Sequence, residues 1–231
     1  MHLPDGFLDA KTWTGLTVVG AGAVALALRQ LKKAQDTGNG TTPSTRAPIV
    51  GLCAAFVFAA QMVNFPVATA VSGHLLGGTL LAILLGPWMG VLVMTAVLVI
   101  QALLLQDGGI TALGANVVNL AFIATLSGYG IYRLILGRPA DESAWSTRRS
   151  IAIFVGAWSS AVLSALAAGA ELALSGVAAA STLLSLMGGI HALIGLGEGL
   201  ITVLVLRYLF ALGYGTTRGF TPALNPPRSH A

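Results

Sequence analysis

The apolar stretch PWMGVLVMTAVLVIQALLL, at residues 87–105, indicates the fold class, because it carries no charge over a length that can cross a bilayer. Similar runs lie before and after it. Of all 231 residues, 55% are hydrophobic and only 9% are charged, whereas a soluble domain carries about 25% charged residues. Too few charges remain to cover a water-facing surface, so the sequence predicts an all-α integral membrane protein.

Seven apolar segments predict a bundle of about seven transmembrane helices. They lie at residues 12–31, 49–65, 74–86, 87–105, 112–135, 150–174 and 182–212. The segment at 74–86 is short, since 1.5 Å per residue gives about 20 Å against a hydrocarbon core of about 30 Å. We expect it to be tilted, broken or re-entrant and packed inside protein, with Gly86-Pro87 separating it from the next helix.

Basic residues predict the orientation of this bundle. Lys and Arg gather in the loops at 29–48 and 133–149 and in the C-terminal tail, which are therefore expected in the cytoplasm. The connections without a basic residue, expected outside, lie at 64–73, 106–111 and 175–181. The N-terminus then lies outside and the C-terminus in the cytoplasm, and His2 and His74 fall on the same outer side.

The first two residues can chelate a transition metal. The amine of Met1, the amide nitrogen of His2 and the imidazole Nδ1 of His2 close a five-membered and a six-membered ring on one ion. The three nitrogens lie nearly in one plane, which favours Ni(II) or Cu(II), with Co(II) next to them. His74 is the natural fourth ligand, because Ser72-Gly73 gives the preceding loop freedom to deliver its ring.

Simpler roles remain open for these residues. His2 alone fits a frayed polar terminus, and His74 fits a helix-end histidine that is hydrogen-bonded to a carbonyl. Gln61 and Asn64 are candidates for holding His74 or the terminus in place from behind the ligands, or for ordinary loop capping. The single cysteine, Cys53, leaves nitrogen and oxygen as the ligand atoms for any metal site.

These expectations define regions of the chain. Residues 1–231 are expected to form a single integral membrane domain. Within it, residues 1–11 form an extracytoplasmic metal-binding segment, residues 36–47 a cytoplasmic linker and residues 64–74 a loop at the metal site. No secretory signal pattern is visible, so the N-terminus is expected to persist in the mature protein.

Polar residues inside the apolar runs also have two interpretations. Glu171, His191 and Glu198 are possible proton carriers. His191 and Glu198 lie seven residues apart on one helical face, which favours a hydrogen-bonded pair that stabilises the bundle. Asn116 and Asn119 are typical of interhelical hydrogen bonds.

Two further features predict packing. Asp107 is expected to cap the following helix, with attraction of cations as the alternative. Asp5 is expected to pin the N-terminal segment through a turn with Gly6. Small residues recur every four positions in the sixth run, at Gly156, Ser160, Ser164 and Ala168. Such a stripe predicts a close helix neighbour, either within the chain or in a coupling subunit.

Five stretches resemble the signatures of the CbiM/NikM family: MHLPDGF at 1–7, QMVNFP at 61–66, SGHLLGG at 72–78, LGPW at 85–88 and QDGGITALGAN at 106–116. Members of that family are the substrate-capturing membrane components of energy-coupling factor transporters for cobalt or nickel. The resemblance implies that Met1, His2 and His74 hold the metal, as the chelate geometry does. The motifs do not distinguish the two metals, and cobalt is the first expectation.

The resemblance further implies high-affinity uptake of Co²⁺ or Ni²⁺ across the inner cell membrane. The implied partners are a transmembrane coupling subunit, cytoplasmic ATPase subunits, a small accessory membrane subunit and the lipid bilayer, with no nucleic acid. The sequence has no G-x-x-x-x-G-K-[ST] loop, so ATP hydrolysis is expected in the partners. The ion is a transported substrate, with no resident cofactor and no catalytic residue. One alternative is a self-sufficient, proton-coupled secondary metal transporter, and another is a membrane enzyme or structural scaffold with no bound metal.

Overall fold

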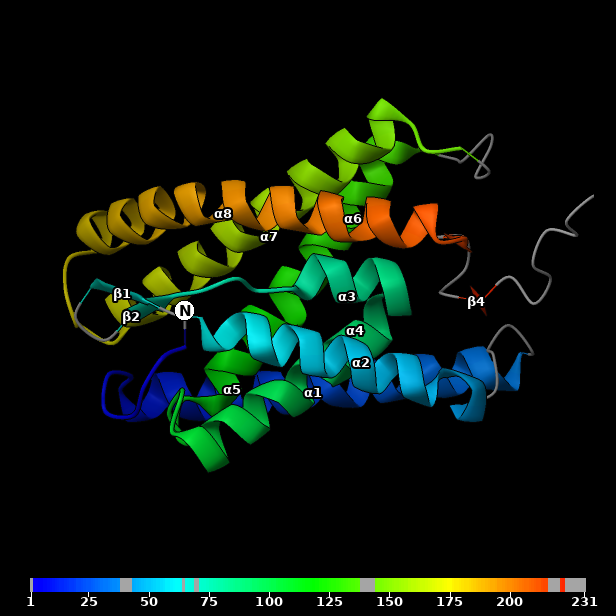
Figure 1. Ribbon diagram of the computed structural model, residues 1–231. Helices are drawn as coiled ribbons and strands as arrows, with labels where there is room; N and C mark the ends of the chain where they lie inside the picture. Colours follow the sequence, from blue (N-terminus) through cyan, green and yellow to red (C-terminus); the bar gives the residue numbers. More distant parts are fainter. Residues whose placement is uncertain are drawn as a thin grey trace, which may run out of the picture.

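The computed structural model describes residues 2–37, 43–63, 65–68, 71–137, 144–215 and 221–222. Its α-helices are α1 (Ala10–Asp36), α2 (Pro43–Met62), α3 (Gly78–Leu85), α4 (Pro87–Ile100), α5 (Leu113–Asn116), α6 (Ala124–Leu136), α7 (Thr147–Leu174) and α8 (Ala180–Ala211). There are also two π-helical turns. The first, η1 (Gln101–Leu105), extends α4, and the second, η2 (Val117–Ile123), connects α5 to α6, so that each forms one longer rod. All seven segments expected to be helical contain a helix (Figure 1).

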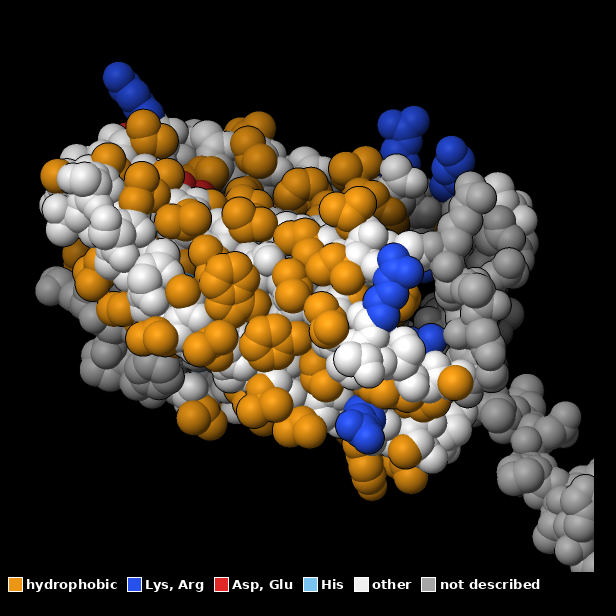
Figure 2. Space-filling model, turned by 90° about the horizontal axis from the view of Figure 1, so that it is seen from above, with side chains coloured by type: hydrophobic (Ala, Val, Ile, Leu, Met, Phe, Trp, Pro, Cys, Tyr) orange, Lys and Arg blue, Asp and Glu red, His pale blue; other side chains and the backbone are white. Residues whose placement is uncertain are grey.

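Among the described residues, five helical rods are long and apolar enough to cross a membrane: α1, α4–η1, α5–η2–α6, α7 and α8. α2 adds a shorter apolar stretch, Ala47–Met62. Hydrophobic side chains cover most of the face in Figure 2, and Leu104 and Leu134 are 75% and 80% exposed. Such an apolar exterior matches hydrocarbon rather than water, which confirms the expectation of a helical multi-pass membrane protein.

The short segment α3 lies inside the bundle. Two glycines with positive φ set its limits, Gly77 (φ 80°) before it and Gly86 (φ 89°) after it. All eight residues of α3 are buried, so protein rather than lipid surrounds this helix. That burial agrees with the expectation that a segment too short to span must pack inside protein.

The stripe of small residues on α7 faces α6 of the same chain. A Cβ added at Gly156 would come within 2.6 Å of the carbonyl oxygen of Gly128 on α6. Ser160 and Ser164 are fully buried. The interpretation of the stripe as a docking surface for a coupling subunit is therefore wrong, because the chain itself covers it.

The loop expected at 64–74 contains an unexpected hairpin. Strand β1 (Phe65–Ala68) pairs antiparallel with β2 (Val71–Gly73), and Phe65 is the partner of Gly73. His74 follows β2 directly, so the paired strand positions the backbone that leads into His74. A second short pair joins β3 (Tyr214–Gly215) to β4 (Thr221–Pro222).

The two ends of the bundle differ in charge. The N-terminal segment, the β1–β2 hairpin and the α7–α8 turn gather at one end, and the C-terminal ends of α1 and α8 lie at the other (Figure 1). Lys32 and Lys33 close α1 and Arg207 lies near the end of α8, so these residues lie opposite the N-terminus. Most of the Lys and Arg in Figure 2 lie toward that same end.

Candidate metal centre

The N-terminal segment is fixed inside the bundle by a backbone-like pairing with Asn116. The N–H of Leu3 donates to Oδ1 of Asn116 at 2.8 Å, and Nδ2 of Asn116 donates to the carbonyl of Leu3 at 3.0 Å. The same carbonyl accepts from the N–H of Gly109 at 2.9 Å. Leu3 is fully buried, so the segment enters the protein core instead of fraying.

Asp5 makes a second anchor. Its carboxylate accepts from the N–H of Ile110 at 3.0 Å and from the N–H of Thr111 at 2.7 Å, and it also bonds the Thr111 hydroxyl. The hydrogen bond from the Thr111 side chain holds the pKa of Asp5 below its ordinary value of 3.8. Asp5 therefore holds the N-terminal segment against residues 110–111. The chain also turns at the next residue, Gly6, as expected, with a positive φ of 86°.

These anchors bury His2, which is 4% exposed. Its Nδ1 donates to Oδ1 of Asp107 at 3.1 Å, while its Nε2 has no hydrogen-bond partner. Burial lowers the pKa of His2 below the ordinary value of 6.5, and the bond to Asp107 opposes that change. A neutral imidazole is the form that binds a metal.

His74 lies against His2. The two rings stack with their centroids 4.5 Å apart and their planes inclined by 21°. Nδ1 of His74 donates to the carbonyl of Leu75 at 2.8 Å, which leaves the fully buried Nε2 with a lone pair and no partner. Burial lowers the pKa of His74 well below its ordinary value of 6.5, so the lone pair is not protonated near neutral pH.

The backbone after His74 is held from two helices. Nε2 of Gln61, on α2, donates to the carbonyl of Leu76 at 2.7 Å. The carboxylate of Glu198, on α8, accepts from the N–H groups of Leu76 and Gly77 at 2.9 and 2.7 Å. Gln61 thus contacts the segment that carries His74.

The stacked rings cannot bind one ion as they stand. An imidazole lone pair lies in the plane of its ring, so two nearly parallel rings direct their lone pairs side by side and not at a common point. Among the described residues, no group of three His, Cys, Asp or Glu side chains is arranged to hold a metal. For both histidines to bind one ion, the His2 ring must therefore turn away from Asp107. Nitrogens of the main chain must then supply the remaining ligands. Met1 and Asn64 lie outside the described residues.

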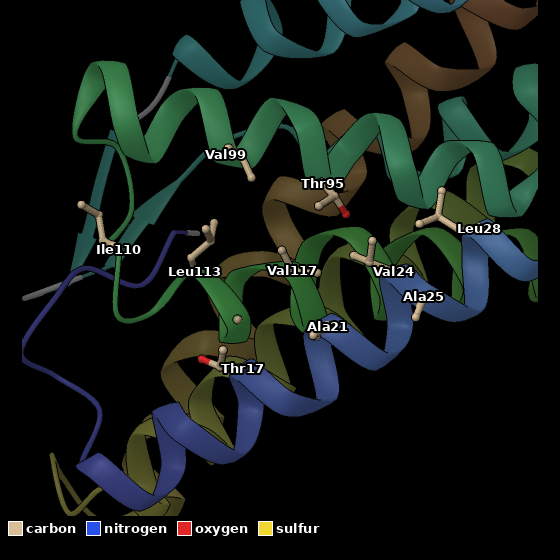
Figure 3. Close-up of a pocket in the computed structure, with 12 residues that line it drawn as sticks. Thr17, Ala21, Val24, Ala25, Leu28, Thr95, Val99, Ile110, Leu113 and Val117 are labelled. Carbon is tan, nitrogen blue, oxygen red and sulfur yellow. The ribbon is translucent and has the colours of Figure 1, made fainter.

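A groove elsewhere in the molecule has the wrong chemistry for a metal. It lies between α1 and α4, has a volume of about 420 Å³ and is lined mostly by apolar side chains (Figure 3). No His, Asp, Glu or Cys lines it. Its walls suit hydrocarbon, and the histidine pair remains the candidate site.

The sequence matches the family model described as the cobalt uptake substrate-specific transmembrane region over residues 2–213. The chain belongs to the CbiM family. A metal transport protein of Haloquadratum walsbyi is 40% identical, over 91% of this chain and 90% of its own length. The fused nickel transport protein NikMN of Archaeoglobus fulgidus is 39% identical, over 91% of this chain and 66% of its own length.

A solved structure gives a matching fold. The crystal structure of a truncated transition metal transporter matches with a TM-score of 0.80 and 32% identity, and the match covers 92% of this chain and 99% of that one. The cobalt transport protein CbiM of Acetohalobium arabaticum is 31% identical over 93% of this chain. The family and the fold are therefore both established for this chain.

Three interpretations of polar residues in this CbiM-family chain need correction. His191 and Glu198 are not paired: Nδ1 of His191 donates to the carbonyl of Met187, and Glu198 bonds the backbone after His74. Seven residues advance a helix by about 10 Å, which is too far for contact. Asp107 bonds His2 and is not the N-cap of α5, which is Ala112. Asn116 bonds the N-terminal segment, and of the two asparagines Asn119 alone makes an interhelical bond, to Glu171.

Gln101 is a residue that the sequence analysis missed. It begins the π-helical turn η1, is fully buried and interacts with the His2 ring. Neither polar atom of its side chain makes a hydrogen bond of good geometry. π-helical turns often occur at functional sites, but a π-helix has no simple sequence signature, so only the structure reveals this residue.

Proposed function

We propose that this chain captures Co²⁺ or Ni²⁺ at the end of the bundle that carries its N-terminus and passes the ion into the cell. The proposal rests on the buried, stacked pair His2 and His74, in which Nε2 of His74 has a lone pair and no partner. A buried polar atom without a partner costs free energy, and an ion that recruits the neighbouring nitrogens would recover part of that cost.

In the proposed site, the amine of Met1, the amide nitrogen and Nδ1 of His2, and Nε2 of His74 surround the ion. The bond from His74 Nδ1 to the Leu75 carbonyl supports this assignment, because a ligating histidine usually donates its other N–H to a fixed acceptor. His2 must exchange its bond to Asp107 for the ion. Asp107 and Gln101 are then available to accept the other ring N–H.

The proposal includes partners and an orientation. We assign the chain to an energy-coupling factor transporter of the inner membrane, with a coupling subunit, ATPase subunits and a small accessory membrane subunit. The fused nickel transport protein NikMN, of which this chain covers 66%, has a further third of chain, which supports an additional component. The basic end of the bundle, with the 36–47 linker, faces the cytoplasm in this proposal.

A self-sufficient, proton-coupled transporter is the second candidate, and the buried carboxylates favour testing it. Glu171 accepts from Asn119 at 2.7 Å, and Glu198 is bonded to two backbone N–H groups. Uptake of radioactive Co²⁺ into vesicles separates the two candidates. Uptake by the chain alone in a proton gradient would support the second candidate, whereas uptake that needs ATP and the partner subunits supports the first.

Metal binding by purified protein with its native N-terminus tests the site. We expect one ion per chain, and we expect His74→Ala to weaken binding strongly because it removes one of four nitrogens. His191→Ala is the matched control, since His191 is also fully buried with an unpartnered Nε2. Loss of binding in His191→Ala with none in His74→Ala would place the ion elsewhere.

A further inference from the structure

Glu198 lies within α8, yet its side chain reaches the segment that carries His74. Oε2 accepts from the N–H of Leu76 at 2.9 Å, and Oε1 accepts from the N–H of Gly77 at 2.7 Å. These donors lie two and three residues after His74. Glu198 is 2% exposed, so solvent does not compete for its oxygens.

The two bonds explain why a carboxylate is tolerated here. The two N–H groups immediately precede α3, and the N-terminal end of a helix carries partial positive charge. The cavity beside Glu198 measures about 20 Å³, which is room for about one water molecule. The carboxylate is therefore enclosed and committed to the backbone of Leu76 and Gly77.

The same segment is held from the opposite direction. Gln61 of α2 donates to the carbonyl of Leu76 at 2.7 Å. Val57, also on α2, packs so closely on Gly77 that a Cβ at that position would lie 2.7 Å from it. Both backbone groups of Leu76 are thus bonded by side chains from two helices, and the position of His74 depends on both.

We propose that Glu198 is a positioning residue in the binding of the transported ion. By bonding the backbone of Leu76 and Gly77 to α8, Glu198 holds His74 in its ligating position. The inference rests on the proposed function, in which His74 is a ligand. It extends the metal site to α8, a helix that contributes no ligand of its own. Removing the negative charge or one of the two bonds allows the segment to relax and moves the ring of His74.

The test is the affinity for Ni(II) of full-length Glu198→Gln with its native N-terminus. Glutamine keeps the size and one acceptor oxygen but turns an NH₂ group toward the second backbone N–H. We expect binding about 10–100-fold weaker, as for other groups that orient a ligand. Glu171→Gln is the matched control, because Glu171 is a buried carboxylate that bonds Asn119 and not the His74 segment; we expect a change within about twofold.

A double-mutant cycle shows whether Glu198 acts through His74. In a His74→Ala background, Glu198→Gln should have an effect within about twofold on the residual Ni(II) binding. An equal loss in both backgrounds, or no loss in either, overturns the inference. If the unmodified chain binds Ni(II) with no dependence on His74, the proposed site fails and the inference fails with it.

A folding control accompanies the cycle. The midpoint of thermal unfolding without metal should be close to that of the unmodified chain for any variant whose affinity is interpreted. If Glu198→Gln does not fold, Glu198→Asp replaces it, because aspartate keeps the charge on a stem shorter by one methylene. A fully native affinity in folded Glu198→Asp and Glu198→Gln alike would contradict the positioning role.

Discussion

Asn116 shows how one side chain can build a binding site. Its amide pairs with both the N–H and the carbonyl of Leu3, as a neighbouring strand would. The pairing is buried, so water cannot replace it. Residues near the end of a chain are usually poorly ordered, whereas Asn116 holds the backbone of Leu3 in one place and so keeps the neighbouring His2 against His74.

Replacing Asn116 with leucine should therefore weaken metal binding. The change leaves the N–H of Leu3 without its partner in a buried place, at a cost of about 1–3 kcal/mol. This cost corresponds to a loss of about 5–150-fold in Ni(II) affinity if the segment leaves its site. Asn119→Leu, three residues along the same rod, is the control and should alter stability more than affinity. Equal affinities in the two variants would contradict the role of Asn116.

Asp5 gives a prediction about pH. Its folded-state pKa is lowered by the Thr111 hydrogen bond, so its contribution is fully present above the ordinary value of 3.8 and is lost as pH falls through the lower folded value. We expect Asp5→Asn to weaken Ni(II) binding by about 3–10-fold, since the contact is exposed. The ratio of the two affinities should be constant between about pH 5 and 8. A ratio that changes across this window in competition titrations would disprove this account.

At the scale of elements, the helices contact one another through glycine. A Cβ at Gly114 would lie 2.4 Å from the Cα of Thr17, and one at Gly20 would lie 2.9 Å from the carbonyl oxygen of Gly114. α1 and α5 therefore touch backbone to backbone. This contact holds α1, which follows the N-terminal segment, against the rod that begins with α5.

Gly114→Ala should force α1 away from α5. We expect a lower midpoint of thermal unfolding in detergent, with a loss of about 1–3 kcal/mol from overpacking. Gly22→Ala on α1 is the control, because nothing lies within 4 Å of the added Cβ and alanine favours a helix by about 1 kcal/mol over glycine. A midpoint for Gly114→Ala equal to that of Gly22→Ala would show that the close contact does not matter.

The sequence was sufficient to predict the helical segments but not the contacts that their side chains make. Apolar length predicted each helical segment, because a membrane span has a required length. It did not predict the β1–β2 hairpin, whose pairing depends on two short strands with no clear alternation. The helical spacing of His191 and Glu198 placed them on one face, but the partner of Glu198 comes from a segment 122 residues away, which no local pattern encodes.

The same limit applies to the candidate site. Residue chemistry and the basic loops brought His2 and His74 to one end, and the structure places their rings in contact. The roles of Asn116, Asp107 and Gln101 depend on how the 101–116 region folds back on the N-terminus. The motif QDGGITALGAN marked this region as important, but it did not indicate which side chain meets which group.

At the scale of the whole molecule, the account predicts which end is reached from outside. In a Cys53→Ala background, Ser181→Cys at the start of α8 should react with a membrane-impermeant maleimide on intact cells. Lys33→Cys, near the end of α1, should react only after the membrane is permeabilised. The reverse pattern would place the histidine pair on the cytoplasmic side and remove the proposed capture from outside.

The most direct measurement of the central claim compares Ni(II) and Co(II) titrations of the native chain with those of a chain bearing one extra alanine before Met1. The extension leaves every side chain in place but moves the terminal amine out of its chelate ring. The account predicts one tightly bound ion in the native chain and far weaker binding in the extended one. Equal binding by both would show that the terminal amine is not a ligand and would contradict the site built on Met1, His2 and His74.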